Sequence, residues 1–409
     1  EVGLVPSFES WIAACGADLS PALAESDGDL ASAFVERSLF GGYLQEQIQA
    51  ALRTSARLKV LHATAVRLEA GKAVILDDGR RLDTDAVVLA TGNLPPRPLK
   101  LGDLSEGTTL VSDPWSPGAL DSLESMSAVL LVGTGLTMVD IVLKLAAAGH
   151  KGPMVAVSRH GLLPAAHRAG GHWAPFIGTQ HLSPRGVLRT IRQAIVRAAA
   201  EDVPWQRVID AVRPSVARLW DSWSARERKQ FLRYLRTRWG VVRHRMAPRV
   251  AARLDALMRS GQLRVVAGRI RGIAKNTSGY EVSVATHGSD SPRFAFDHVV
   301  NCTGPRTDIR EIEYPLLADL RRQGLIVPDP LGLGIETDDC AAVNAQGRAS
   351  EWLFAIGALT QPAWWEITAV PEINAQIVRL VQNLAAMREH RGRKRAPLAE
   401  EFVELGAGI

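Results

Sequence analysis

The sequence predicts an α/β protein with two related halves, and three observations support this prediction. A pattern of apolar segments occurs twice, in residues 57–93 and in residues 261–305. A strand-like segment, a glycine-containing turn and an apolar helix stand before the second copy only. Residues 165–260 show the periodicity of amphipathic helices instead of the alternation of strands. We therefore expect a helical insertion in the second half.

Each copy of the pattern has an apolar segment, alternating apolar residues around a turn, and a strand that ends in Thr-Gly. The opening segment is 57–63 in the first copy and 262–268 in the second. Alternating apolar residues predict strands, and a glycine after a buried strand lets the chain pass close to a ligand. The candidate cofactor-binding residues at these strand ends are Thr91, Gly92, Thr303 and Gly304.

The segment before the second copy predicts a dinucleotide-binding turn. The apolar strand 128–132 continues into Gly133-Thr134-Gly135-Leu136 and a helix over 136–148. A tight glycine turn lets the backbone approach a pyrophosphate, and the helix N-terminus offers N–H groups and a positive dipole end to it. Met138 replaces the third glycine of the usual fingerprint. The alternative is a buried strand–turn–helix unit without a ligand.

Composition excludes several classes of protein. A chain of 409 residues is long enough for two domains and an insertion. Cys15, Cys302 and Cys340 are widely spaced and form no CxxC, which argues against a disulfide framework, a zinc site or a dithiol relay. We predict no metal site. Cys302 lies beside Thr303 and is either close to a cofactor or, as we favour, a buried small hydrophobe.

The apolar run 128–148 is the one candidate membrane span in the sequence. Glycines at 133 and 135, Asp140 and Lys144 interrupt it, and a strand–turn–helix unit explains these residues where a span does not. We expect a structural role for Asp140. No basic leader precedes the run, so we predict a cytoplasmic protein without a membrane partner.

The helical block is rich in Arg and Trp. Most of its basic residues are explained by solvated helix faces, for example in 187–200 and 226–239. Arg243, His244 and Arg245 are adjacent and cannot share one helix face, so we predict an anionic partner there, either a cofactor phosphate or an acidic substrate. The net charge of +5 and the absence of interleaved aromatic residues argue against nucleic-acid binding.

These residues carry a family resemblance. The chain resembles FAD/NAD(P)-binding oxidoreductases of the two-dinucleotide-domain (glutathione-reductase-like) superfamily, in particular a bacterial branch near the class B flavoprotein monooxygenases. The matching segments are 34–44, 88–93, 133–140, 158–161, 243–248 and 356–372. The resemblance implies two Rossmann-like domains. It also implies that an N-terminal GxGxxG segment of the FAD domain is missing, which agrees with a chain that begins with Glu.

The resemblance also divides the chain. Residues 1–110 and 298–409 correspond to a discontinuous FAD-binding domain, residues 111–164 and 261–297 to an NAD(P)-binding domain, and residues 165–260 to the insertion. On the FAD side, Gly357 follows the last strand, and Ala358 stands where related folds often have Asp. A helix expected to begin at Glu366 would direct the N–H groups of Ile367 and Thr368 at the flavin.

The expected strand 153–158 ends where a dinucleotide-binding domain reads the adenosine ribose. An acidic residue there accepts a hydrogen bond from the 2′-OH of NAD, whereas Arg pairs with the 2′-phosphate of NADP. This sequence has Ser158-Arg159-His160 and no acid, so we predict NADPH in preference to NADH, with assistance from Arg168. The alternative is that Arg159 is an exposed loop residue.

The resemblance implies an NAD(P)H-dependent flavoprotein oxidoreductase with FAD and NADP as cofactors. We predict a monooxygenase-like enzyme for a small polar substrate, an amine or amino acid, whose carboxylate is held by Arg243 or Arg245. No residue stands out as nucleophile or base. The alternatives are a flavin reductase or dehydrogenase without oxygenation, and a non-catalytic flavin-fold scaffold. A homo-oligomer or an N-terminal segment would complete the FAD site.

Overall fold

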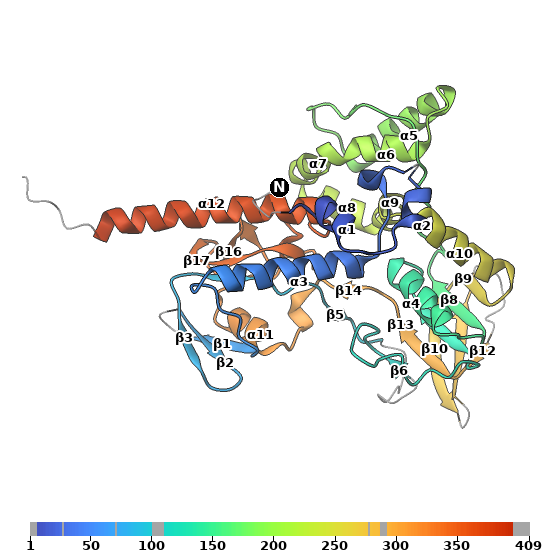
Figure 1. The fold of residues 1–409 in the computed structure, drawn as a ribbon, viewed down its shortest axis with the longest axis horizontal. Coiled ribbons are helices and arrows are strands. Elements are labelled where there is room, and N and C mark those ends of the chain that lie inside the picture. The colour runs from blue at the N-terminus through green and yellow to red at the C-terminus, as the bar shows by residue number, and fades with distance from the viewer. Residues whose placement is uncertain are drawn as a thin grey trace, which may run out of the picture. The chain divides into compact units, whose positions relative to one another are not determined.

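The computed structural model describes residues 6–26, 28–69, 72–99, 110–276, 279–286 and 293–395. The described chain forms two compact units. The first contains Val60–Gly92 and the residues from Asp308 onward, and the second contains Pro6–Lys59 and Asn93–Thr307. Both units combine strands with helices, so the predicted α/β class is confirmed (Figure 1).

A parallel sheet is the centre of the second unit. Its five strands lie in the order β6-β13-β7-β8-β9, and every neighbouring pair is parallel. Helix α4 (Leu136–Ala147) connects β7 to β8 along the chain, as in a Rossmann-like domain. The strands are β6 (Leu110–Val111), β7 (Val129–Val132), β8 (Met154–Ser158), β9 (Leu263–Ala267) and β13 (His298–Asn301).

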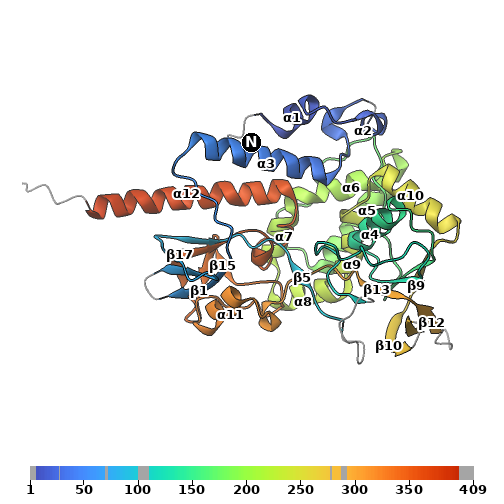
Figure 2. The ribbon, with the colours of Figure 1, turned by 60° about the horizontal axis from the view of Figure 1, so that its bottom comes forward.

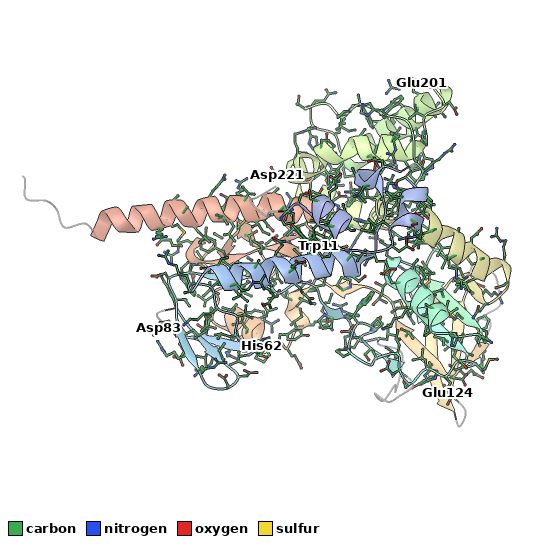
Figure 3. The ribbon with its side chains drawn as sticks, in the orientation of Figure 1. Trp11, His62, Asp83, Glu124, Glu201 and Asp221 are labelled. Carbon is green, nitrogen blue, oxygen red and sulfur yellow. The ribbon has the colours of Figure 1, made fainter. Side chains whose placement is uncertain are left out.

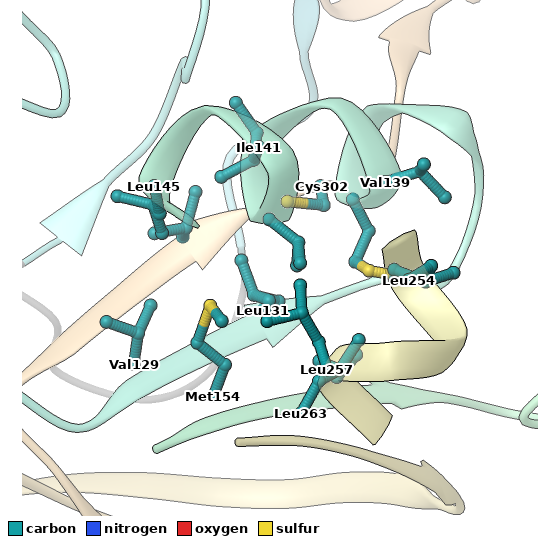
Figure 4. Close-up of a cluster of buried hydrophobic side chains, with 14 of the residues drawn as sticks. Val129, Leu131, Val139, Ile141, Leu145, Met154, Leu254, Leu257, Leu263 and Cys302 are labelled. Carbon is teal, nitrogen blue, oxygen red and sulfur yellow. The ribbon is translucent and has the colours of Figure 1, made fainter. Parts of the chain in front are cut away.

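Both faces of this sheet are buried, which explains why its strands are almost entirely apolar. Leu131 and Met154 point to one face and pack in a cluster with residues of α4 and of α10 (Pro248–Arg259) (Figure 4). Leu130 and Val157 point to the other face and pack on an antiparallel meander. The meander consists of β10 (Arg269–Asn276), β11 (Gly279–Ala285) and β12 (Arg293–Phe296). The start of α4 is thus held by a sheet that is packed on both sides.

The insertion is helical, as the sequence predicts. Its other helices are α5 (Pro184–Ala200), α6 (Trp205–Val212), α7 (Val216–Ser222), α8 (Ala225–Tyr234) and α9 (Arg236–Arg243). The predicted helix 226–239 is interrupted at Leu235, where α8 ends and α9 begins. Two of its tryptophans belong to a core of the insertion itself, because Trp220 and Trp223 pack against the ring of Phe231.

Pro6–Lys59 belong to the second compact unit. The helices are α1 (Phe8–Ala14), α2 (Ser20–Ala24) and α3 (Arg37–Thr54). Trp11, labelled in Figure 3, donates a hydrogen bond to Glu46 and so joins α1 to α3. Arg37 forms an ion pair of 3.3 Å with Asp140, which gives Asp140 the structural role predicted for it and joins α3 to α4.

The first unit contains a mixed sheet and a meander. The sheet has the order β15-β16-β17-β4, and β17 is parallel to β4. Asp319, buried on α11, accepts a hydrogen bond of 3.0 Å from the N–H of Leu68 and so attaches the meander to that helix. Helix α12 (Val370–Arg395) is a single long helix (Figure 2). The elements are β1 (Ala65–Glu69), β2 (Ala73–Leu76), β3 (Arg81–Asp83), β4 (Val87–Leu89), α11 (Pro315–Arg322), β15 (Thr337–Asp338), β16 (Ala341–Val343), β17 (Ala349–Ala355) and α12 (Val370–Arg395).

Two expectations about elements need correction. Residues 57–63 form no strand, whereas their counterpart forms β9 beside β8. The helix expected at Glu366 begins at Val370, because residues 365–368 form a turn. The second compact unit extends to Thr307 and includes β13, which pairs with β6 and β7; the domain boundary at residue 298 stays a prediction. In the described part of the chain, no helix has the length and apolarity that crossing a membrane requires.

Candidate functional site

The turn after β7 requires glycine at position 133. Gly133 has a φ of +119°, and a Cβ there would lie 2.4 Å from the carbonyl oxygen of Cys302. The close approach of two neighbouring strand ends therefore selects glycine. Cys302 is buried in the cluster beneath α4, and burial raises the pKa of its thiol to about 12. The thiol is neutral, as expected for a small hydrophobic core residue and not for a reactive one.

Position 135 has open space around it, so the packing of the described residues does not require glycine there. It is the N-cap of α4, no side chain caps the helix, and a Cβ at Gly135 would meet no heavy atom within 4 Å. The first N–H groups of a helix have no partner within the helix, and together with the dipole they attract an anion. The turn Gly133–Leu136 therefore fits a cofactor pyrophosphate, because the backbone is open where the phosphates would approach.

Two hydroxyl groups join this turn to the end of the next strand. Thr134 donates a hydrogen bond of 2.6 Å to the carbonyl of Leu162, and its oxygen lies 2.8 Å from the hydroxyl oxygen of Ser158. Ser158 also accepts from the N–H of Gly161 at 3.1 Å. Thr134 and Ser158 thus fix two loops at the carboxyl edge of the sheet. Arg159 and His160, which follow, are exposed to solvent.

The third strand end at this edge is that of β13. Thr303 donates from its hydroxyl group to the side chain of Asn301 at 2.7 Å, and Asn301 donates to the carbonyl of Arg97 at 3.0 Å. Asn301 is fully buried, and sequence reasoning missed it. An amide in an otherwise apolar strand was the available signal, since a buried polar group needs hydrogen-bond partners. The structure therefore brings the turns at 133–136, 158–160 and 303–304 to one sheet edge.

The first unit has a corresponding edge, formed by β4 and β17. The N–H of Ile356 donates to the carbonyl of Leu89 at 3.0 Å, so Thr91-Gly92 and Gly357 follow neighbouring parallel strands. Gly357 has a φ of +73°, and a Cβ there would meet no heavy atom within 4 Å. Ligands of α/β proteins bind outside the carboxyl ends of such strands. The residues present fit the edge of a flavin at this position.

Gln376 holds the turn at Gly357 in place. Its side-chain oxygen accepts from the N–H of Gly357 at 2.8 Å, and its amide nitrogen lies 2.8 Å from the hydroxyl oxygen of Thr360. Gln376 is fully buried on the first turns of α12, and sequence reasoning missed it. Before α12, Ile367 is buried and Thr368 is exposed, with the N–H of Thr368 donating to Glu366.

Arg245, a predicted substrate residue, is already paired with a carboxylate. Its side chain is 2% exposed and donates to Asp210 at 2.5 Å and to the carbonyl of Gln206 at 3.1 Å. His167 lies 3.4 Å away. Burial, and secondarily the charge of Arg245, lowers the pKa of His167 to about 4, so the imidazole is neutral at pH 7. Arg245 therefore belongs to a buried network that stabilises the insertion.

Arg243 and His244 lie at the end of α9, outside that pair. Arg243 is the last residue of the helix, and the N–H of His244 donates to the carbonyl of Gly240. Arg243 ends the helix, His244 is its C-cap and Arg245 lies beyond it. The three residues therefore do not share one helix face, as the sequence predicts. In the described residues, no three His, Cys, Asp or Glu side chains gather as ligands for a metal ion.

Comparison with known proteins identifies the fold. Residues 3–94 match a family model described as FAD-NAD(P)-binding. Over 400 residues, the chain is 21% identical to uncharacterised proteins of Mycobacterium bovis and Mycobacterium tuberculosis, with 86% of this chain and 73% of each relative covered.

Three solved structures are similar over most of the chain. One is the reduced ornithine hydroxylase of Pseudomonas aeruginosa, with a TM-score of 0.58, 17% identity, and 94% of this chain and 83% of that chain covered. Another is L-lysine 6-monooxygenase of Pseudomonas syringae, with a TM-score of 0.57, 17% identity, and coverage of 91% and 80%. The third is the ornithine N-hydroxylase of Kutzneria sp. 744 with reduced FAD, NADP+ and L-ornithine, with a TM-score of 0.57, 17% identity, and coverage of 94% and 83%.

The chain therefore has the fold of the two-dinucleotide-domain flavoprotein oxidoreductases, as its sequence predicts. Within that class, its structural neighbours include the ornithine and lysine monooxygenases. The match to an FAD-NAD(P)-binding family and the open glycine turns support the two cofactors predicted from the sequence.

Proposed function

We propose that this protein is an FAD- and NADPH-dependent oxidoreductase that hydroxylates a small amine or amino-acid-like substrate. The observation that carries the proposal is the open turn at Gly135, at the N-terminus of an uncapped helix in a fold shared with amino-acid monooxygenases. The substrate class follows from the neighbours, whose names specify ornithine and lysine.

Different residues of this chain bind different parts of the two cofactors. The turn Gly133–Leu136 and the first N–H groups of α4 bind the pyrophosphate of NADPH, and Arg159 binds its 2′-phosphate. Thr91, Gly92 and Gly357 border the flavin, and Gln376 holds the last of these turns. When bound, FAD supplies the two-electron redox chemistry that side chains lack, while the protein positions the reacting groups.

Arg243 is the proposed partner of a substrate carboxylate or of a second anionic group. Arg245 is paired with Asp210, and removing it would leave a carboxylate without its cation. We assign Arg245 a structural role for this reason. His244, beside Arg243, supplies an imidazole that can form hydrogen bonds at the same helix end.

Completion of the flavin site is a further part of the proposal. Among the described strands, β17 alone pairs with β4, so the other edge of β4 has no strand partner there. An unpaired strand edge accepts another strand. We propose that a strand–turn–helix segment from outside these residues, or a second copy of the chain, supplies it. The cytoplasmic location stays a prediction from the sequence.

The test of the proposal measures flavin binding and electron transfer separately. The purified chain is incubated with FAD, passed through a desalting column and examined for visible absorbance, and NADPH oxidation is then followed with L-ornithine, L-lysine and simple amines. We expect flavin retention, and NADPH consumption that yields hydroxylated amine. Complete conversion of the electrons to hydrogen peroxide with every substrate would favour a flavin reductase. A colourless chain that consumes no NADPH would contradict the enzyme assignment.

A further inference from the structure

Charge is distributed unevenly along this chain. Residues 165–260 contain 19 Arg and Lys but six Asp and Glu, a balance of +13, whereas the whole chain has a net charge of +5. All other residues together therefore carry a net charge of −8. The most acidic segment is 1–36, which contains seven Asp and Glu and no Lys, Arg or His. Two segments of opposite charge in one chain indicate an electrostatic interaction between surfaces.

The cations of α5 lie on one exposed face of that helix. Arg185, Arg189 and Arg192 are spaced by four and then three residues, so they share a face, and all three are exposed. The opposite face is buried and contains Ile191 and Ala194. In the part of the chain that the structure describes, none of the three arginines pairs with a carboxylate.

Helix α8 adds a second exposed row of cations next to the start of α5. The two helix starts are joined by Trp223, which donates from its ring to the carbonyl of Leu182 at 2.8 Å. The cations of α8 are also exposed, and they form no ion pair with a described residue. We call the six residues of both helices the basic surface: Arg185, Arg189, Arg192, Arg226, Lys229 and Arg233.

The acidic residues of the N-terminal segment also lack cationic partners. Glu9 lies on α1, and Glu36 is the N-cap of α3. Asp18 and Asp29 accept hydrogen bonds from backbone N–H groups two residues later. All four are exposed, and none forms an ion pair with a residue that the structure describes. We call these four residues the acidic surface.

The segments that carry the two surfaces touch each other. Arg249, on α10 of the insertion, donates to the carbonyl of Phe34 at 2.9 Å, and the ring of Phe34 lies 4.7 Å from that of His167. Both segments belong to the same compact unit. A two-fold contact brings one patch of a protein against the same patch of a second copy, so a patch with neighbouring acidic and basic parts can complement itself.

A long polyanion fits this arrangement less well than a second copy of the chain does. A nucleic acid or an anionic membrane would gain contacts with the basic surface, but its phosphates would also approach the acidic segment attached to the insertion. Like charges at short range cost free energy. A second copy offers both signs of charge.

We propose that two copies of this chain associate through these surfaces, with the acidic surface of each copy against the basic surface of the other. Each pairing of surfaces then occurs twice. The charges are exposed to solvent, so they determine orientation and the rate of association more than affinity. The dimer is therefore reversible and sensitive to salt. This proposal does not depend on the enzymatic activity of the chain.

The first test is the salt dependence of association, measured by sedimentation of the full chain. We expect a dimer at about 0.1 M NaCl, with a Kd that rises about tenfold or more at about 1 M, because the screening length falls from about 10 Å to about 3 Å. A chain that is monomeric at the lower salt concentration, or a dimer with the same Kd at both, would overturn the proposal.

The second test reverses the charge of each surface. Arg189→Glu with Arg192→Glu reverses charges on the basic surface, and Glu9→Lys with Glu36→Lys does so on the acidic surface. Each double variant should be monomeric by itself, because both contacts then join like charges. An equimolar mixture should dimerise, because both contacts again join opposite charges. Failure of the mixture to dimerise, or a dimer of either variant alone, would contradict the pairing of these surfaces.

Arg269→Glu with Arg271→Glu is the matched control. Both arginines are exposed on β10, and the change in net charge equals that of the basic-surface variant. This control should dimerise like the wild type, and circular dichroism should show that all variants are folded. Loss of its dimer would indicate a general effect of net charge and would overturn the proposal.

A third measurement separates a second copy from a polyanion. The wild-type chain is titrated with a short DNA duplex and with phosphatidylglycerol vesicles at the lower salt concentration. We expect neither to compete with dimerisation. A monomeric chain that binds either of them through Arg189 and Arg192 would assign the basic surface to a polyanion and refute the dimer.

Discussion

The two copies of the repeated sequence pattern have different structures. In the second copy, Leu263 is 2% exposed in β9, which pairs with β8. The aligned Leu58 of the first copy is 41% exposed, and residues 57–63 form no strand. An apolar segment becomes a strand when a neighbouring edge accepts its hydrogen bonds, because an unpaired backbone gains little from the extended conformation. The apolar pattern thus allows a segment to form a strand, and the presence of a neighbouring strand edge determines whether it does.

The glycine turns of the two units differ in a related way. Gly133 is required by the protein itself, since any Cβ would collide with the backbone of Cys302. Gly357 has open space around it and is held by a side chain, that of Gln376. One turn is thus defined by the packing of strands, and the other by a single buried amide. Four predictions test these contrasts.

The largest expected effect is that of Gly133→Ala. The added Cβ must displace the strand end at Cys302, and the positive φ adds strain, so we expect a loss of about 4 kcal/mol in the free energy of unfolding. Urea denaturation measures it. Gly135→Ala is the control, because its Cβ meets open space: stability should fall by no more than about 1 kcal/mol, the difference between glycine and alanine at an N-cap, while the KM for NADPH rises. Equal stability of the two variants would contradict the packing argument.

Alanine at the two aligned leucines tests the comparison of the repeats directly. Leu263→Ala removes a buried side chain and should lower the free energy of unfolding by about 3 kcal/mol. Leu58→Ala acts at an exposed position and should change it by less than about 0.5 kcal/mol. Both values come from the same denaturation experiment. A large loss in Leu58→Ala would show that the first copy is buried in solution, for example by a partner strand.

Gln376→Leu tests the flavin-side turn. The substitution leaves the N–H of Gly357 without its acceptor and removes one of the two hydrogen bonds of the Thr360 hydroxyl, at a cost of about 2 kcal/mol. We expect a lower melting temperature and weaker flavin retention after desalting. Gln382→Leu changes an exposed glutamine of the same helix and serves as the control. Unchanged flavin retention in Gln376→Leu would contradict the proposal that this turn borders the flavin.

The smallest expected effect is the pH dependence caused by His167. In the folded protein its pKa is about 4, whereas its ordinary value is 6.5. Between these values the unfolded chain binds a proton that the folded chain does not, so stability falls as the pH decreases from 7 to 5. Because the ring is partly exposed, we expect a loss of about 1 kcal/mol in the free energy of unfolding. Denaturation of His167→Gln at both pH values should show a smaller loss; an identical loss would exclude His167 as a cause.

The sequence was most informative where the physical signal is local. The turn at Gly133–Leu136 was predicted because an apolar strand, two glycines and an apolar helix follow one another within a short segment. The insertion was predicted as helical because amphipathic periodicity needs no distant partner. The pairing of Arg245 with Asp210 was not predicted, since it joins residues on separate segments whose approach depends on the packing of α6.

The sequence by itself determined the α/β class, the glycine turn, the helical nature of the insertion and the position of Arg159 after a strand. The tertiary structure decided which apolar segments became strands, which arginine pairs with a carboxylate, and which residues hold the turns. The physical reason is that periodicity and backbone conformation act over a few residues. Hydrogen bonds such as those of Asn301 and Gln376, and the ion pair of Arg245 with Asp210, act between segments that folding alone brings together.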